Sequence, residues 1–226
     1  MTVLSACQEA AVELNQTEPT VLFAATDKFA REMRVQANKS AVAIAKAYDW
    51  QRLTTRATIT GDSSTTAFAL PADYDRMALK TNLSSNSSNI DLVKIVDLDQ
   101  WDYFQNHVTP TAPGYWIILG GQIQINPAPA TGVIHSYYYI SNYVATGKTA
   151  FTADADVFLL PERLLTLSII WRWRAMKRME YAEDMRNFEI AMAEETAKDK
   201  GSRVLVKGPM RVPYGTTTAY PRPLGS

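Results

Sequence analysis

Residues 164–174, LLTLSIIWRWR, are apolar on nearly every side of a helix and predict the centre of the fold. A helix that is apolar all round is buried among other elements. Pro161 and Glu162 can open it, because proline is tolerated in the first helical turn. The run is too short and too polar to span a bilayer, since Thr166, Ser168 and Arg172 interrupt it. This helix therefore needs amphipathic partners elsewhere in the 226 residues.

Three further helices can supply those partners. Apolar residues recur at helical spacing over residues 3–14, 27–48 and 181–200, where Asp27 is a suitable N-cap and Gly201 a suitable stop. The three apolar faces are Val3, Leu4, Cys7, Ala10, Ala11 and Leu14; Phe29, Met33, Ala37, Ala41, Ile44 and Tyr48; and Tyr181, Met185, Phe188 and Met192. These faces predict a helical bundle made from both ends of the chain.

The middle of the chain has the pattern of β-structure. Paired glycines suit the positive φ angles of a tight turn, so Gly120-Gly121 between two apolar runs is the clearest hairpin signal. Gly61-Asp62-Ser63-Ser64, flanked by β-branched residues, predicts strand, turn and strand. The expected strands cover residues 51–60, 65–70, 76–83, 115–119, 122–126 and 133–143, and a short helix is expected from Asp97.

The predicted fold class is α+β, with a helical bundle from the N- and C-terminal helices, an inserted antiparallel β-sandwich or barrel, and an extended C-terminal arm. The bundle domain takes residues 1–50 and 155–200. The inserted β domain takes residues 51–154, and the arm takes residues 201–226. Four prolines stop the arm from continuing the helix, yet its apolar residues are typical of a segment that orders against another chain. A frayed terminus, or a strap across its own domain, is the alternative.

Charge is balanced overall but unevenly placed. Zero net charge argues against a protein dedicated to coating nucleic acid. Residues 61–160 hold nine acidic and four basic groups, whereas residues 201–226 hold four basic groups and no acidic one. This asymmetry indicates complementary contacts between copies or with partners.

The sequence predicts no catalytic, cofactor-binding or metal-binding residue. It lacks a phosphate-binding glycine loop, a Cys-x-x-Cys pair and a His-Glu-x-x-His helix. His107 and His135 lie in different predicted elements, and Cys7, the only cysteine, is expected to be buried. No signal peptide is expected. The pairs Asp73/Asp75, Asp97/Asp99 and Asp154/Asp156 flank turns or helix starts, which favours capping over hydrolytic or calcium-binding roles.

Aromatic residues leave two further functions open. Tyr115, Trp116, Tyr137, Tyr138, Tyr139 and Tyr143 suit either a sheet core or the sugar-stacking platform of a monomeric carbohydrate-binding module. Trp171-Arg172-Trp173-Arg174 suits a nucleic-acid surface, although buried indoles with arginine stems at the core edge are favoured.

In the order of its motifs the chain resembles the head-to-tail adaptor, or connector, proteins of tailed bacteriophages. The resemblance covers nearly the whole chain and includes its basic, proline-containing end. It rests on Asn38-Lys39, Tyr48-Asp49-Trp50, Leu70-Pro71-Ala72-Asp73-Tyr74-Asp75-Arg76-Met77, Pro113-Gly114-Tyr115-Trp116-Ile117 with the following hairpin, Ile170-Trp171-Arg172-Trp173-Arg174, and Tyr181-Ala182-Glu183-Asp184.

The resemblance implies a structural virion protein without catalytic activity or cofactor. Such adaptors form a ring, typically of twelve copies, that binds the portal protein, extends the channel for double-stranded DNA and presents a surface to the next tail component. It also implies assembly in the bacterial host cytoplasm and a place in the virion neck. Family members dock to the portal partly through a C-terminal arm, which carries over here to Arg203, Lys207, Arg211, Tyr214, Tyr220 and Arg222.

Overall fold

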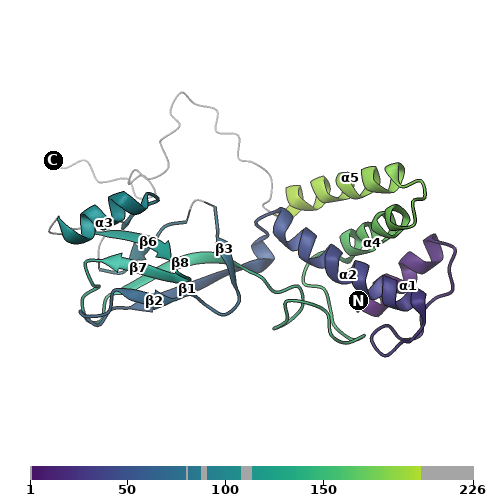
Figure 1. Cartoon of the computed structure of the whole chain (residues 1–226), viewed down its shortest axis with the longest axis horizontal. Coiled ribbons are helices and arrows are strands. Elements are labelled where there is room, and N and C mark those ends of the chain that lie inside the picture. Colours follow the sequence, from purple (N-terminus) through teal and green to yellow (C-terminus); the bar gives the residue numbers. More distant parts are fainter. Residues whose placement is uncertain (1, 80, 88–90, 108–113, 200–226) are drawn as a thin grey trace, which may run out of the picture.

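The computed structural model describes residues 2–79, 81–87, 91–107 and 114–199, which form an α+β fold. Helices from both ends of the chain gather at one end of the molecule, and the sheets lie at the other (Figure 1). The helices are α1 (Val3–Glu13), α2 (Lys28–Ala47), α4 (Glu162–Met176) and α5 (Ala182–Asp199). The predicted arrangement, an inserted β region between paired helical ends, is confirmed. None of the described helices has the length and apolar character needed to cross a membrane.

Helix α4 is the centre of the helical part, as its all-round apolar sequence predicts. It contacts α1, α2 and α5, and its buried residues include Leu164, Ile169 and Trp173. Cys7 on α1 is fully buried in the same core, and burial is the main cause that raises the pKa of its thiol to about 12. A fully buried thiol of this pKa is an unreactive packing residue.

Helix starts follow the sequence signals closely. Asp27 accepts a hydrogen bond from the backbone N–H of Ala30 at 2.9 Å, which confirms it as the N-cap of α2. Asp97 accepts one from the N–H of Asp99 at 2.9 Å and caps α3 (Leu98–Asn106), the predicted short helix. Side-chain oxygens at this position satisfy amides that have no partner within the helix.

The β region is a sandwich of two sheets. One sheet has the order β1-β8-β3, with β4 also paired to β8, and the other has the order β2-β7-β6-β5. The strands are β1 (Thr54–Thr60), β2 (Ala67–Ala69), β3 (Tyr74–Met77), β4 (Ser84–Ser85), β5 (Val93–Lys94), β6 (Tyr115–Leu119), β7 (Gln122–Asn126) and β8 (Ile134–Ser141). Ile59, Tyr137 and Tyr139 of the first sheet pack against Trp116, Ile123 and Ile125 of the second. All strand pairs are antiparallel except β5 with β6.

Strands β6 and β7 form the predicted hairpin. Leu119 pairs with Gln122, and Gly120 and Gly121 have φ angles of 60° and 74°. Side chains with a Cβ disfavour these angles, so the glycine pair sets the turn.

The first predicted strand pair differs from expectation. Strands β1 and β2 both form, but β1 pairs with β8 and β2 with β7, so the chain crosses between sheets at Gly61. The N–H of Gly61 donates to the carbonyl of Val133 at 2.8 Å, and a Cβ there would lie 2.4 Å from the carbonyl oxygen of Ala130. The glycine thus permits a close backbone approach rather than a local hairpin.

Two predicted boundaries also differ. Residues Gln51–Leu53 form a 3₁₀ turn, so the first strand begins at Thr54 rather than at residue 51. The strand expected over residues 76–83 is β3, which ends at Met77. Leu83 is nevertheless fully buried in the sandwich core, and this burial explains why an apolar residue stands at this position without being part of a strand.

The segment after β8 returns to the helical part. Val144, Ala145 and Phe151 are buried in the same core as α1, α2 and α4. The domain limits expected at residues 50/51, 154/155 and 200/201 stay predictions. The arm of residues 201–226 lies outside the described residues.

Candidate functional site at the helix–sheet junction

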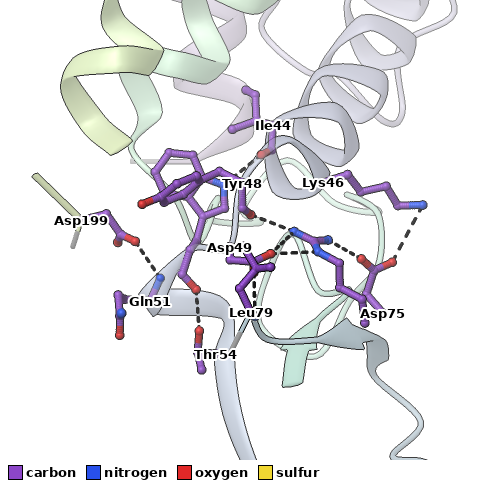
Figure 2. A network of polar contacts seen from close by, with 11 residues as sticks. Ile44, Lys46, Tyr48, Asp49, Gln51, Thr54, Asp75, Leu79 and Asp199 are labelled. Carbon is purple, nitrogen blue, oxygen red and sulfur yellow. Dashed lines mark hydrogen bonds and ion pairs between the residues drawn. The ribbon is translucent and has the colours of Figure 1, made fainter. Parts of the chain in front are cut away.

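The polar network where the helices meet the sheets is the candidate site, and is called here the junction (Figure 2). Its residues come from the end of α2, the start of β1, strand β3 with the turn after it, and the end of α5. They are Lys46, Tyr48, Asp49, Trp50, Gln51, Thr54, Asp75, Arg76, Leu79 and Asp199. Two of the motifs in the resemblance, Tyr48-Asp49-Trp50 and Leu70–Met77, are therefore neighbours in space.

Arg76 is the hub of the junction. Its Nε donates to Oδ1 of Asp49 at 3.0 Å, and its Nη1 donates to Oδ2 of Asp75 at 2.5 Å. Its Nη2 lies 2.9 Å from Oδ1 of Asp49 and donates to the carbonyl oxygen of Tyr48 at 2.9 Å. Such a fork of charge-assisted bonds fixes geometry as well as energy. Arg76 therefore ties strand β3 to the end of α2.

Asp49 extends the network toward the sheet. Its Oδ2 accepts a hydrogen bond from the N–H of Leu79 at 3.0 Å, and its side chain is 12% exposed. Lys46 lies 4.0 Å from Asp75 at the solvent edge. Around Arg76, two carboxylates thus face one guanidinium and one ammonium, and Asp199 adds a third carboxylate to the junction.

Trp50 lies between the end of α2 and the start of β1. Its side chain is fully buried, and Nε1 donates to the carbonyl oxygen of Ile44 at 2.9 Å. That carbonyl is in the last turn of α2, where helices leave acceptors without internal partners. The ring also packs edge-to-face on Tyr48 with centroids 5.3 Å apart. Oγ1 of Thr54 donates to the carbonyl oxygen of Trp50 at 2.9 Å and fixes the start of β1.

The last described residue of α5 is bound to this junction. Oδ2 of Asp199 accepts a hydrogen bond from the N–H of Gln51 at 2.7 Å. The hydroxyl of Tyr48 also donates to the carbonyl oxygen of Thr196 at 3.4 Å. The predicted docking residues Arg203, Lys207, Arg211, Tyr214, Tyr220 and Arg222 lie outside the described residues, but the point from which that segment departs is held against the helix–sheet boundary.

Asn38, another residue of the resemblance, fixes the loop that follows the sandwich. Its Oδ1 accepts from the N–H of Phe151 at 2.7 Å, and its Nδ2 donates to the carbonyl oxygen of Phe151 at 3.4 Å. The amide of Asn38 thus bonds both backbone groups of Phe151, as a neighbouring strand would. Phe151 is thereby held in the helical core.

The three aspartate pairs hold the chain itself, although only Asp97 caps a helix. Asp154 accepts hydrogen bonds from the N–H groups of Leu22 and Phe23 at 3.0 and 2.9 Å. Asp73 accepts from the hydroxyl of Tyr139 at 2.8 Å, and Asp75 binds Arg76. The expected capping is thus right for Asp97. The other pairs use the same chemistry on loops and strands.

Asp156 is the most strongly perturbed of these carboxylates. Burial acts to raise its pKa, but the hydrogen bond from Lys148 and those from the N–H groups of Thr152 and Ala153 outweigh burial and lower the pKa to about 2. Hydrogen bonds to the charged form favour that form. No cluster among the described residues joins three or more histidine, cysteine, aspartate or glutamate side chains in a geometry suited to a metal ion.

The sheet aromatics are mostly core residues. Trp116, Tyr137 and Tyr139 are at most 4% exposed, and Tyr115 stacks on Phe104 with centroids 4.2 Å apart. Tyr138 alone of the consecutive tyrosines points outward, at 48% exposure. Buried rings cannot stack on a sugar, so these three residues form the sheet core and not the alternative sugar-stacking platform.

The Trp-Arg repeat of α4 is also used internally. Trp173 is buried and its Nε1 donates to Glu32 at 3.1 Å, while Arg174 pairs with Asp184 at 2.6 Å. Trp171 packs on Tyr181, which directly precedes α5, and on Phe188 of α5. The favoured interpretation, buried indoles with arginines at the core edge, holds for Trp173, whereas Trp171 is half-buried.

Within the described residues, a polar junction joins the helices to the sheets, and the carboxylates and aromatics discussed above hold the chain's own backbone and cores. The family model of the SU10 adaptor protein matches residues 1–213, and the chain belongs to this family of phage structural adaptors. The match includes the junction and continues past Gly201 into the predicted arm. A comparison with curated proteins finds no match.

Proposed function

We propose that the chain is a virion protein of the neck, where a ring of about twelve copies joins the portal to the tail and extends the channel for double-stranded DNA. It has no catalytic role in this proposal, and it assembles in the host cytoplasm. The observation that carries the proposal is the family match over residues 1–213. The helix–sheet arrangement supports it, because the two parts are joined through the hydrogen bonds of Arg76 and Asp49 and can present separate surfaces to separate partners.

The arm of residues 201–226 is the proposed contact with the portal. Its four basic groups and absence of acidic ones suit an acidic docking surface. Asp199 and Thr196 hold the end of α5 against the junction, which supports a fixed starting point for the arm. Fully extended, 26 residues reach at most about 85 Å, which is enough to cross onto a neighbouring ring.

The DNA channel is the second element of the proposal. Of the nine acidic groups in residues 61–160, Asp97, Asp99 and Asp102 are exposed at the start of α3 or on it, and Asp91 is exposed before β5. A lumen lined by carboxylates repels the phosphate backbone and lets DNA slide without sequence-specific binding. If α3 lies away from the lumen in the assembled ring, this explanation of the acidic surplus is wrong.

Removal of the arm tests the proposal directly. We expect a chain of residues 1–202 to keep the far-ultraviolet circular dichroism of the full chain and to lose co-sedimentation with portal rings of the same phage.

Reversal of two arm charges, Arg211→Glu with Arg222→Glu, should weaken docking. The matched control, Arg178→Glu with Arg186→Glu on the exposed surface of the helical part, should not. Unchanged docking by the shortened chain would refute the arm assignment.

A further inference from the structure

Helix α2 presents a basic face to solvent. Lys28, Arg31 and Lys39 are exposed, and of the three Lys28 acts on a carboxylate of its own helix, lowering the pKa of Glu32. Val35, which is 45% exposed, lies on the same face. A shallow groove continues this face onto α4, lined by Asn38, Lys39, Val42, Ala43 and Arg172. The groove thus has an apolar floor between two cations, with no acidic residue in its lining.

The side chain of Arg172 lines one side of this groove and is fixed by contacts within α4. Its Nε donates to Oγ of Ser168 at 3.2 Å, and its guanidinium lies 4.7 Å from the centroid of the Trp171 ring. Its two terminal nitrogens make no hydrogen bond within the described part of the chain. A guanidinium fixed by stacking loses little entropy when it binds a carboxylate.

Helix α1 carries the opposite charge on its outer side. Glu9, Val12 and Glu13 are exposed, and Val12 is 61% exposed. Positions i, i+3 and i+4 of a helix share one face, so the three residues form one exposed ridge, with Val12 and Glu13 side by side about one turn beyond Glu9. The groove beside the ridge is lined by Glu9, Glu13, Glu162, Arg163, Thr166 and Leu167. Arg163 does not neutralise this groove, because it pairs with Glu194 at 3.0 Å.

The two faces lie on opposite sides of the helical part. Arg163 lines the acidic groove, Arg172 lines the basic one, and both belong to α4. Their nine-residue separation is about 2.5 turns at 3.6 residues per turn, so the two side chains point in opposite directions from the helix. One subunit cannot bring its own acidic ridge to its own basic groove.

We infer that the acidic ridge of α1 (Glu9, Val12, Glu13) packs into the basic groove of a second copy of this chain (Lys39, Val42, Ala43, Arg172). Val12 covers the apolar floor, and the two glutamates face the two cations. A contact between two different faces is heterologous, and repetition of such a contact closes a ring when its rotation allows. The inference rests on the proposed ring and assigns the surfaces that join its neighbours.

Cysteine cross-linking tests the pairing. A chain with both Val12→Cys and Ala43→Cys, treated with a short bis-maleimide in concentrated solution and on portal rings, should give a ladder of covalent multimers. Buried Cys7 does not interfere. Each single variant should give no covalent multimer, because the contact joins unlike faces. A control chain with Val12→Cys and Ala193→Cys, whose second site is exposed on α5, should give no ladder.

Charge exchange gives an independent readout. Lys39→Glu and Glu13→Lys should each weaken association between copies about tenfold, because like charges then face each other. The two changes combined in one chain should restore most of the loss. Arg186→Glu, an equal charge change on the exposed side of α5, is the control and should have little effect.

The outcomes separate this inference from the proposed function. A ladder in either solution or portal-bound protein supports it. Absence of the ladder in both, or cross-linking of the Val12→Cys variant alone through a symmetric α1–α1 contact, would overturn it. Portal co-sedimentation depends on the arm and is read separately, so docking without a ladder defeats only the lateral contact.

Discussion

Arg76 connects the two parts of the molecule at the scale of single residues. Its loss would leave the carboxylate of Asp49, 12% exposed, without its cation. Because an uncompensated, partly buried charge is costly, we expect Arg76→Ala to lower the free energy of unfolding by about 2 kcal/mol. Urea denaturation followed by tryptophan fluorescence measures this change.

The control for Arg76 is an exposed ion pair elsewhere. Lys198, 66% exposed and paired with Glu195, should contribute less than about 0.5 kcal/mol. If Lys198→Ala destabilises the protein as much as Arg76→Ala, the junction has no special part in joining helices to sheets.

Asp156 makes stability depend on pH in the acid range. Its folded pKa, about 2, lies below the ordinary value of 3.8, so the folded state binds this proton less readily than the unfolded state. Its contribution is therefore complete above about pH 4 and is lost as pH falls through about 2. We expect Asp156→Asn to reduce the pH dependence of unfolding in this window, as measured by denaturation at a series of pH values.

A second variant examines the cause of that shift. Lys148→Met removes the cation whose hydrogen bond lowers the pKa of Asp156, so it should flatten the same pH window. An acid limb that neither variant changes would show that Asp156 does not carry the effect.

Local contacts were predictable at this scale, and distant ones were not. Asp27 and Asp97 could be assigned as caps, because a cap binds amides two or three residues away. Asp154 binds Leu22 and Phe23, far away in the chain, and no local pattern signals that contact. The family resemblance identified the junction motifs in the sequence. Their contact with each other through Arg76 became visible only in the folded structure.

The β6–β7 turn shows how a secondary-structure element depends on backbone conformation. A Cβ added at Gly121 would meet no atom within 4 Å, so the cost of a side chain there comes from its φ of 74° alone. We expect Gly121→Val to destabilise the protein by about 1–2 kcal/mol in thermal denaturation. Gly121→Asn should cost less, since asparagine tolerates this region. Equal costs for the two variants would contradict the conformational explanation.

Element types were more predictable than their pairing. Periodicity identified α1, α2, α4 and α5, and the glycine pair identified β6 and β7, because each signal is local. The separation of β1 and β2 into different sheets was not predictable, because it depends on the close contacts of the Gly61 backbone with Ala130 and Val133. Those residues are distant in sequence and carry no sign of the pairing.

At the scale of the whole molecule, we propose three contact surfaces. The acidic ridge on α1 and the basic groove on α2 and α4 suit neighbouring copies. The end of α5, fixed at the junction, is where the predicted arm begins. The functional assignment could be reached from the sequence only through family resemblance. The sequence contains none of the catalytic motifs discussed above, and surfaces that mediate assembly have no short sequence motif.

An electron cryomicroscopy reconstruction of the virion neck would show whether the chain has the proposed place and contacts. We predict a ring of this chain between portal and tail, with residues 201–226 against the portal and α1 of each copy against α2 of the next. A reconstruction that places the chain elsewhere in the particle, or in the neck as isolated monomers with the arm away from the portal, would contradict the account.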